Sequence, residues 1–342
     1  MENSSSSQSM VDFWGVITES KRIINAHSRH FLALSVLFLL PLSFSLSVFP
    51  TLLHTFTSPA TNHIVSLLRL TTSQNPPILL HPILNQHHHK TLIFSLLFSS
   101  FIIFFSLLAF ASITFSVFHG FYGRPVKLAS AISSLLRSFF PLLITFIAAQ
   151  IVVFVILSLF GAFAYLGMKG IEGIEGGFSY NSVYFHALSS IGVVLLGLVL
   201  VYVCVNWVLV GVIVVVESKW GFEPMVRSKG LVRGMRWVAL SLIMFFGFFE
   251  LVLLWISVVS GSNAGAELDG WNSWAFVVQI VATTAVLTLV LLHGIAATTV
   301  LYMYCKALHG ELAGEIAHEF AAEYVSLPFD EKKVPHVVCF VY

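Results

Sequence analysis

Four polar side chains interrupt otherwise apolar stretches of this sequence, and they are the first candidates for chemistry. Glu250 is the one acidic residue inside the long apolar runs, and Gln150, Asn206 and His293 each lie in a different run. A charge at the centre of a membrane-spanning helix costs about 2.5–3.5 kcal/mol on insertion scales, so it faces a bundle interior or is protonated. Counted at about 1.5 Å per residue, the four groups fall within about 10 Å of depth. They are predicted to form one interior polar layer, either a path for a solute or proton or polar contacts between helices.

Two other patterns suggest metal ligands. Consecutive imidazoles at 87–89 can bind zinc or copper, but three in a row cannot supply tetrahedral geometry alone. Glu315 and His318 have the spacing of carboxylate-bridged di-metal bundles, yet they make at most half of such a site. No set of nucleophile, base and orienting group is visible. We expect no cofactor, no metal site and no enzymatic activity.

The elements that position these residues follow from composition. Of 342 residues, 57% are hydrophobic and 10% are charged, against about 25% charged in a soluble domain. Apolar runs of about 20 residues or more are long enough to cross a bilayer, where only a helix satisfies its own backbone in such a run. The sequence predicts an all-α integral membrane protein with six spans, at Phe31–Leu53, Leu92–Phe118, Pro141–Phe163, Ser189–Val216, Trp237–Val259 and Phe276–Tyr302.

The distribution of Lys and Arg predicts the orientation. Of the 17 such residues, all but Arg69, Lys90 and Lys169 fall on one side of the predicted spans, together with both termini. Positive charge gathers on the cytoplasmic side of membrane proteins. Both termini are therefore expected in the cytoplasm, with the endomembrane system and the plasma membrane equally possible.

A repeated pattern precedes every second span. A basic, partly amphipathic segment leads directly into spans one, three and five, so the fold is predicted as three repeats of an interfacial helix plus two spans. Such helices lie in the headgroup layer, where anionic lipids of the cytoplasmic leaflet attract their cations. The predicted membrane-surface cations are Lys21, Arg22, Arg29, Lys127, Arg137, Arg227, Lys229, Arg233 and Arg236.

The chain divides into three parts on this basis. Residues 1–30 form a cytoplasmic segment with an amphipathic helix, 31–302 the transmembrane domain and 303–342 a cytoplasmic tail. In the tail, glutamates at every fourth position from Glu311 predict an acidic helix face, either in water or against the basic loops. Cys305, just past the last predicted span, is a possible acylation site. The net charge of +1 argues against nucleic acid, whereas a protein partner at the cytoplasmic face stays open.

Two stretches carry resemblances to known families. The N-terminal run FWGVITESKRIINAHSRHFLALSVLFLLP and the tail YVSLPFDEKKVPHVV are similar to a plant family of multi-span membrane proteins with no assigned activity. The stretch VIVVVESKWGFEPMVRSKGLVRGMRW more distantly resembles bacterial membrane domains joined to glycerophosphodiester phosphodiesterases. In those proteins a separate soluble domain is catalytic, so the resemblance implies a membrane module without its own chemistry. The function expected is therefore membrane organisation or partner binding, with a transporter or channel as the alternative.

Overall fold

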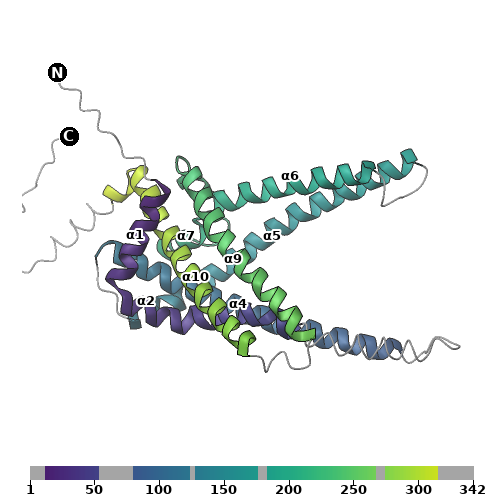
Figure 1. Ribbon diagram of the computed structural model, residues 1–342. Helices are drawn as coiled ribbons and strands as arrows, with labels where there is room; N and C mark the ends of the chain where they lie inside the picture. Colours follow the sequence, from purple (N-terminus) through teal and green to yellow (C-terminus); the bar gives the residue numbers. More distant parts are fainter. Residues whose placement is uncertain (1–11, 54–79, 124–127, 176–182, 267–273, 315–342) are drawn as a thin grey trace, which may run out of the picture.

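The computed structural model describes residues 12–53, 80–123, 128–175, 183–266 and 274–314 of the chain. These residues are helical almost throughout and contain no strand (Figure 1). The elements in chain order are α1 (Phe13–Ala26), α2 (Ser28–Leu34), a π-helical turn η1 (Ser35–Leu39), α4 (Leu80–Phe121), α5 (Leu128–Glu175), α6 (Val183–Trp207), α7 (Val210–Glu217), α8 (Glu223–Leu231), α9 (Arg236–Ala266) and α10 (Trp274–Leu308).

Six helical stretches are long and apolar enough to cross a membrane. This confirms the prediction of an all-α membrane protein with six spans. Most of the observed stretches extend a few residues beyond the predicted limits, because the helices continue past the apolar runs. They are Ser28–Leu53, Thr91–Phe121, Arg137–Gly170, Ser189–Glu217, Arg236–Gly261 and Trp274–Leu308.

The three basic segments take different forms. The first is the separate helix α1, which ends at His27 where the backbone leaves the helical region (φ −122°, ψ 36°). The third contains α8, a short helix between two turns. The second continues into its span as the single helix α5, with Pro141 inside it. A break between two helices leaves several backbone groups without hydrogen-bond partners in apolar surroundings. A proline inside a continuous helix, such as Pro141 in α5, removes only one backbone hydrogen bond.

Helix α1 is held against the bundle by one face. Val16, Ile23 and Ile24 are buried, whereas Lys21 and Arg22 are exposed. The apolar face of this helix is therefore the one that packs, and α10 is the main helix that it contacts.

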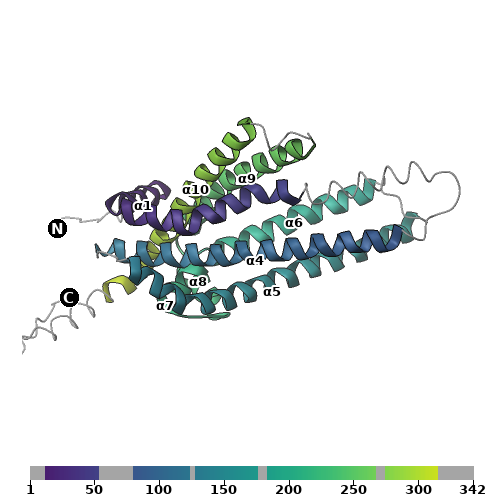
Figure 2. The same cartoon turned by 90° about the horizontal axis from the view of Figure 1, so that it is seen from below.

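The buried core lies toward one end of the bundle. Fully buried side chains there include Leu34 on α2, Ile113 on α4, Ile213 on α7, Leu231 on α8 and Tyr302 on α10. Away from this end, α5 and α6 leave the other helices and run side by side toward Glu175 and Val183 (Figures 1 and 2). Their outer parts are covered with exposed apolar side chains, as expected of a surface that faces lipid: Phe154, Leu159, Leu166, Val193 and Leu198.

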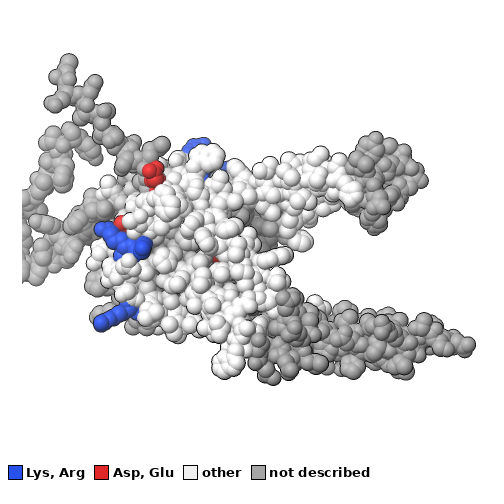
Figure 3. All heavy atoms as spheres, viewed as in Figure 1, with Lys and Arg blue, Asp and Glu red and all other residues white. Residues whose placement is uncertain are grey.

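Most charged side chains visible in Figure 3 gather at the end where α1 and the last turns of α10 lie. We call this the charged end, defined by the network of Glu217, Lys219, Glu223, Arg227 and Glu311 together with α1. The first and last described residues both belong to it, as six alternating spans require.

Candidate functional site

The four residues of the predicted polar layer differ in their exposure. Gln150 on α5 has an exposed side chain, Glu250 on α9 and His293 on α10 are half-buried, and Asn206 near the end of α6 is buried. All four belong to the described residues, and no hydrogen bond or ion pair joins any two of them. The proposed path through them stays a prediction.

Two of these four side chains bond to their own helix. Nδ2 of Asn206 donates to the carbonyl of Tyr202 at 2.7 Å. Nδ1 of His293 lies 2.9 Å from the carbonyl of Leu289. Such bonds to the preceding turn satisfy polar groups in lipid without linking helices.

Asn206 lies at a break in the fourth span, which divides into α6 and α7 at 208–209. A break frees backbone carbonyls that need other donors. The hydroxyl of Ser228 on α8 donates to the carbonyl of Asn206 at 2.6 Å, and both residues are buried. The break is thus the point where α8 attaches to the span.

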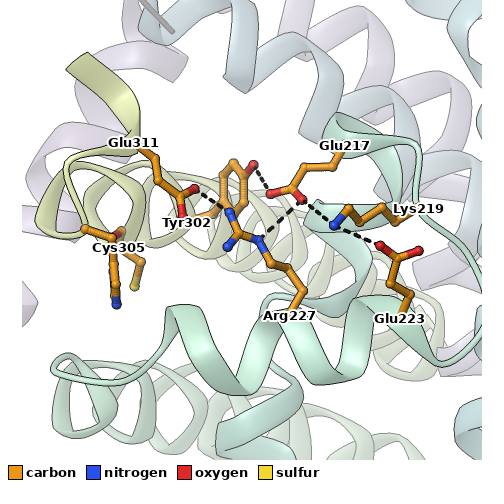
Figure 4. A network of polar contacts seen from close by, with 8 residues as sticks. Glu217, Lys219, Glu223, Arg227, Tyr302, Cys305 and Glu311 are labelled. Carbon is orange, nitrogen blue, oxygen red and sulfur yellow. Dashed lines mark hydrogen bonds and ion pairs between the residues drawn. The ribbon is translucent and has the colours of Figure 1, made fainter. Parts of the chain in front are cut away.

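The best-organised polar cluster lies at the charged end, around Glu217 (Figure 4). Glu217 is the last residue of α7, and its side chain is 13% exposed. The hydroxyl of Tyr302 on α10 donates to its Oε1 at 2.9 Å. Its Oε2 lies 3.5 Å from Nε of Arg227, at ion-pair distance but without hydrogen-bond geometry, and 3.8 Å from Nζ of Lys219. Glu217 thereby ties α7, α8 and α10 together.

Arg227 extends the cluster to the residues that follow α10. Its second guanidinium nitrogen forms a close hydrogen bond and ion pair with Oε2 of Glu311. This hydrogen bond raises the pKa of Arg227 although burial opposes it, and Glu217 adds to the rise. The same bond lowers the pKa of Glu311. Arg227 is therefore a charged guanidinium that pairs with two carboxylates, those of Glu217 and Glu311.

The turn after α7 brings these groups together. Ser218 takes a left-handed conformation (φ 56°) and ends α7, and Gly221 (φ 75°) completes the reversal. The N–H of Gly221 donates to Oγ1 of Thr145 on α5 at 3.0 Å, which fixes the turn to a neighbouring span. Nζ of Lys219, in this turn, lies 2.9 Å from Oε1 of Glu223, the first residue of α8.

The predicted membrane-surface cations fall into two groups. Arg227 is committed to the network, and Arg22 pairs with Glu19 at 2.6 Å, which raises the pKa of Arg22. Lys127 lies outside the described residues. The others are exposed and have no acidic partner within the described chain: Lys21, Arg29, Arg137, Lys229, Arg233 and Arg236.

The remaining candidates are placed as follows. Cys305 belongs to α10 and is fully buried, with its Sγ 3.8 Å from the sulfur of Met235. The sequence predicts Cys305 just past the last span, but the span continues to Leu308 and the thiol is packed inside the bundle. The histidines at 87–89 lie in α4, but their side chains are outside the described structure, as are Glu315 and His318. Within the described residues no group of three or more His, Cys, Asp or Glu could hold a metal ion.

Neither Glu217 nor Tyr302 belongs to a motif that could be recognised in the sequence. Glu217 falls in the stretch that resembles the bacterial membrane domains, and its partners lie far along the chain. Tyr302 is 85 residues away from it, and Glu311 is 84 residues from Arg227. The one available signal was the acidic face of the tail opposite the basic loops, which included Glu311.

Comparison with curated proteins finds no match. Comparison with solved structures finds none either. A family model described as a domain of unknown function, DUF8558, matches residues 1–329, nearly the whole chain. With its six apolar helices and a polar cluster that closes one end of the bundle, the chain belongs to the DUF8558 family.

Proposed function

We propose that the protein is a non-enzymatic, membrane-organising module that binds anionic phospholipid at its charged end. The observation that supports this is the charge balance of that end. Glu217, Glu223 and Glu311 pair within the network, and Glu19 pairs with Arg22. Six exposed cations have no acidic partner within the described chain, and each cation near an anionic leaflet contributes about 1 kcal/mol.

The same residues support the proposed orientation. Lys and Arg concentrate on the cytoplasmic side of membrane proteins, and the cytoplasmic leaflet is the anionic one. We place the charged end and both termini there. The resemblance to plant membrane proteins of unassigned activity, and to membrane domains whose chemistry resides elsewhere, agrees with a module that acts by binding. A protein partner would meet the same cationic surface.

Retention of lipid tests the proposal. The protein is reconstituted in phosphatidylcholine bilayers containing phosphatidylserine, and co-purifying lipid is identified by native mass spectrometry. The test variant carries Lys229→Gln, Arg233→Gln and Arg236→Gln. The control carries Arg22→Gln and Lys219→Gln, whose cations already have acidic partners.

We expect the parent protein and the control to retain phosphatidylserine in preference to phosphatidylcholine, and the test variant to lose that preference. High salt should weaken it in the parent protein, because exposed charges are screened. Equal retention by the test and control variants would refute the role of the unpaired cations.

A second candidate, transport of a proton or small solute, depends on Glu250. Its side chain is half-buried in the middle of α9 and has no hydrogen-bond or ion-pair partner within the described chain. A charged carboxyl in the middle of a span costs about 2.5–3.5 kcal/mol, and ionisable residues at such depth often mark the path of an ion or solute. Proton flux into vesicles that is lost in Glu250→Leu and reduced in Glu250→Gln would favour transport. Equal flux from all three proteins would leave Glu250 as a packing residue.

A further inference from the structure

The segment between the fourth and fifth spans folds back onto the end of the bundle. It leaves the fourth span through Ser218 (φ 56°) and enters the fifth after Gly234 (φ 105°). A side chain at Gly234 would meet Leu308 at 3.0 Å, so the chain passes close to α10 there. Helix α8 is therefore fixed at both ends, beside the level at which the two spans end.

The two faces of α8 differ sharply. Pro224, Met225, Ser228 and Leu231 face the bundle and are buried. On the opposite face, Val226 is 74% exposed, and Phe222, the residue directly before α8, is 59% exposed. Lys229 lies beside them on α8, and Arg233 follows in the turn after α8; both are exposed. The outward face thus carries large apolar side chains next to cations, with the exposed Glu223 beside them paired to Lys219.

Two tryptophans flank this face at the level where the spans end. Trp220 comes three residues after the end of the fourth span and is 62% exposed, and Trp237 is the second residue of α9 and is 81% exposed. Tryptophan is enriched at the boundary between bilayer and water, because its ring is apolar and its N–H is polar. The flanks of α8 therefore lie at headgroup depth.

The neighbouring charges identify what covers the apolar side chains. Leaving groups of this size in water is unfavourable by about 25 cal/mol per Å² of apolar surface. A purely apolar partner surface would leave Lys229, Arg233 and Arg236 without counter-charges. A leaflet of anionic phospholipid satisfies both requirements, with acyl chains for the rings and phosphates for the cations.

We propose that α8 inserts into the cytoplasmic leaflet as an interfacial anchor. Phe222 and Val226 reach the boundary between headgroups and acyl chains, Trp220 and Trp237 fix the depth, and Lys229 and Arg233 bind lipid phosphates. This inference takes its lipid class from the proposed function. It adds insertion, which binding by cations alone does not require.

Spin-label accessibility tests the insertion. Single cysteines replace Phe222, Val226 and, as the polar-side control, Glu223, which is turned toward Lys219. The background carries Cys204→Ser and Cys339→Ser, and Cys305 is buried. Each labelled protein that melts like the unlabelled one is placed in phosphatidylcholine bilayers, with and without phosphatidylserine. Collision with oxygen, which concentrates in acyl chains, is compared with collision with a water-soluble nickel complex.

Labels at 222 and 226 should collide mainly with oxygen and the label at 223 mainly with nickel. Labels at 222 and 226 that behave like 223 overturn the inference, as do labels closed to both reagents, which would indicate a protein cover. Retention of phosphatidylserine with nickel-accessible labels would defeat insertion and leave the proposed function standing. Inserted labels without such retention would defeat the lipid preference alone.

Discussion

Replacing Arg227 by glutamine removes the cation that joins Glu217 to Glu311. Breaking a buried ion pair by deleting one partner costs about 3–5 kcal/mol, whereas exposed pairs contribute about 0–1 kcal/mol. The side chain of Glu217 is 13% exposed and that of Arg227 is 30% exposed, so the case lies between these limits. We expect a loss of about 2 kcal/mol, and at roughly 2 °C per kcal/mol for a long chain this lowers the melting temperature by about 4 °C.

The assay is thermal unfolding in bilayer nanodiscs, monitored by tryptophan fluorescence at one scan rate, because membrane proteins often unfold irreversibly and the midpoint then depends on rate. Arg22→Gln is the matched control, since it removes an arginine that also forms an ion pair but whose side chain is 75% exposed. It should melt like the parent protein. Equal melting temperatures of Arg227→Gln and Arg22→Gln would show that the buried Glu217 carboxylate is not stabilised by Arg227. That result would refute the expected difference between the buried and the exposed ion pair.

Three further outcomes are expected. Gly211→Ala should lower the free energy of unfolding by about 1–3 kcal/mol, because its new Cβ would lie 2.5 Å from the ring of Phe110. The control is Gly247→Ala, whose Cβ would meet nothing within 4 Å. In the same melting assay it should be neutral or slightly stabilising. Arg227 lowers the pKa of Glu311 below its ordinary value of 4.5, so the pair stabilises the protein above that pH and its contribution is lost as pH falls through the lowered pKa. Glu311→Gln should therefore have a lower melting temperature than the parent protein at neutral pH. In strong acid the two melting temperatures should be equal, and a difference that persists there would contradict the role assigned to the Glu311 carboxylate. Cys305 should resist a small maleimide in folded protein and react after denaturation, as seen by intact mass; labelling of the folded protein would show that the thiol is not buried.

Sequence reasoning located the spans because membrane crossing depends on local properties. A run of apolar residues must exceed the bilayer thickness and must be helical, whatever lies beside it. The buried face of α1 was predictable for a similar reason, since Val16 and Ile24 share one side of a helix. Such features need no knowledge of the neighbouring elements.

The network around Glu217 was not predictable in this way. Its geometry depends on a left-handed Ser218, on a break at 208–209 inside an unbroken apolar run and on partners more than 80 residues away. Depth alone also could not show whether the residues of the predicted polar layer face one another. Equal depth on four helices says nothing of the direction in which each side chain points, and the side chain of Gln150 is exposed on α5.

Helix α5 is much longer than the hydrocarbon core of a bilayer is thick, so its fit depends on membrane thickness. The helix has 48 residues, and at 1.5 Å per residue it is about 72 Å long, more than twice the hydrocarbon thickness of about 30 Å. Even its apolar part of 34 residues exceeds that thickness. Tilt and local thickening accommodate the excess at fractions of a kcal/mol per Å of mismatch. Helix α5 packs against the core at its charged end, whereas its outer part is exposed. A change in bilayer thickness would therefore be met by a change in the tilt of the outer part, with the packed end held in place.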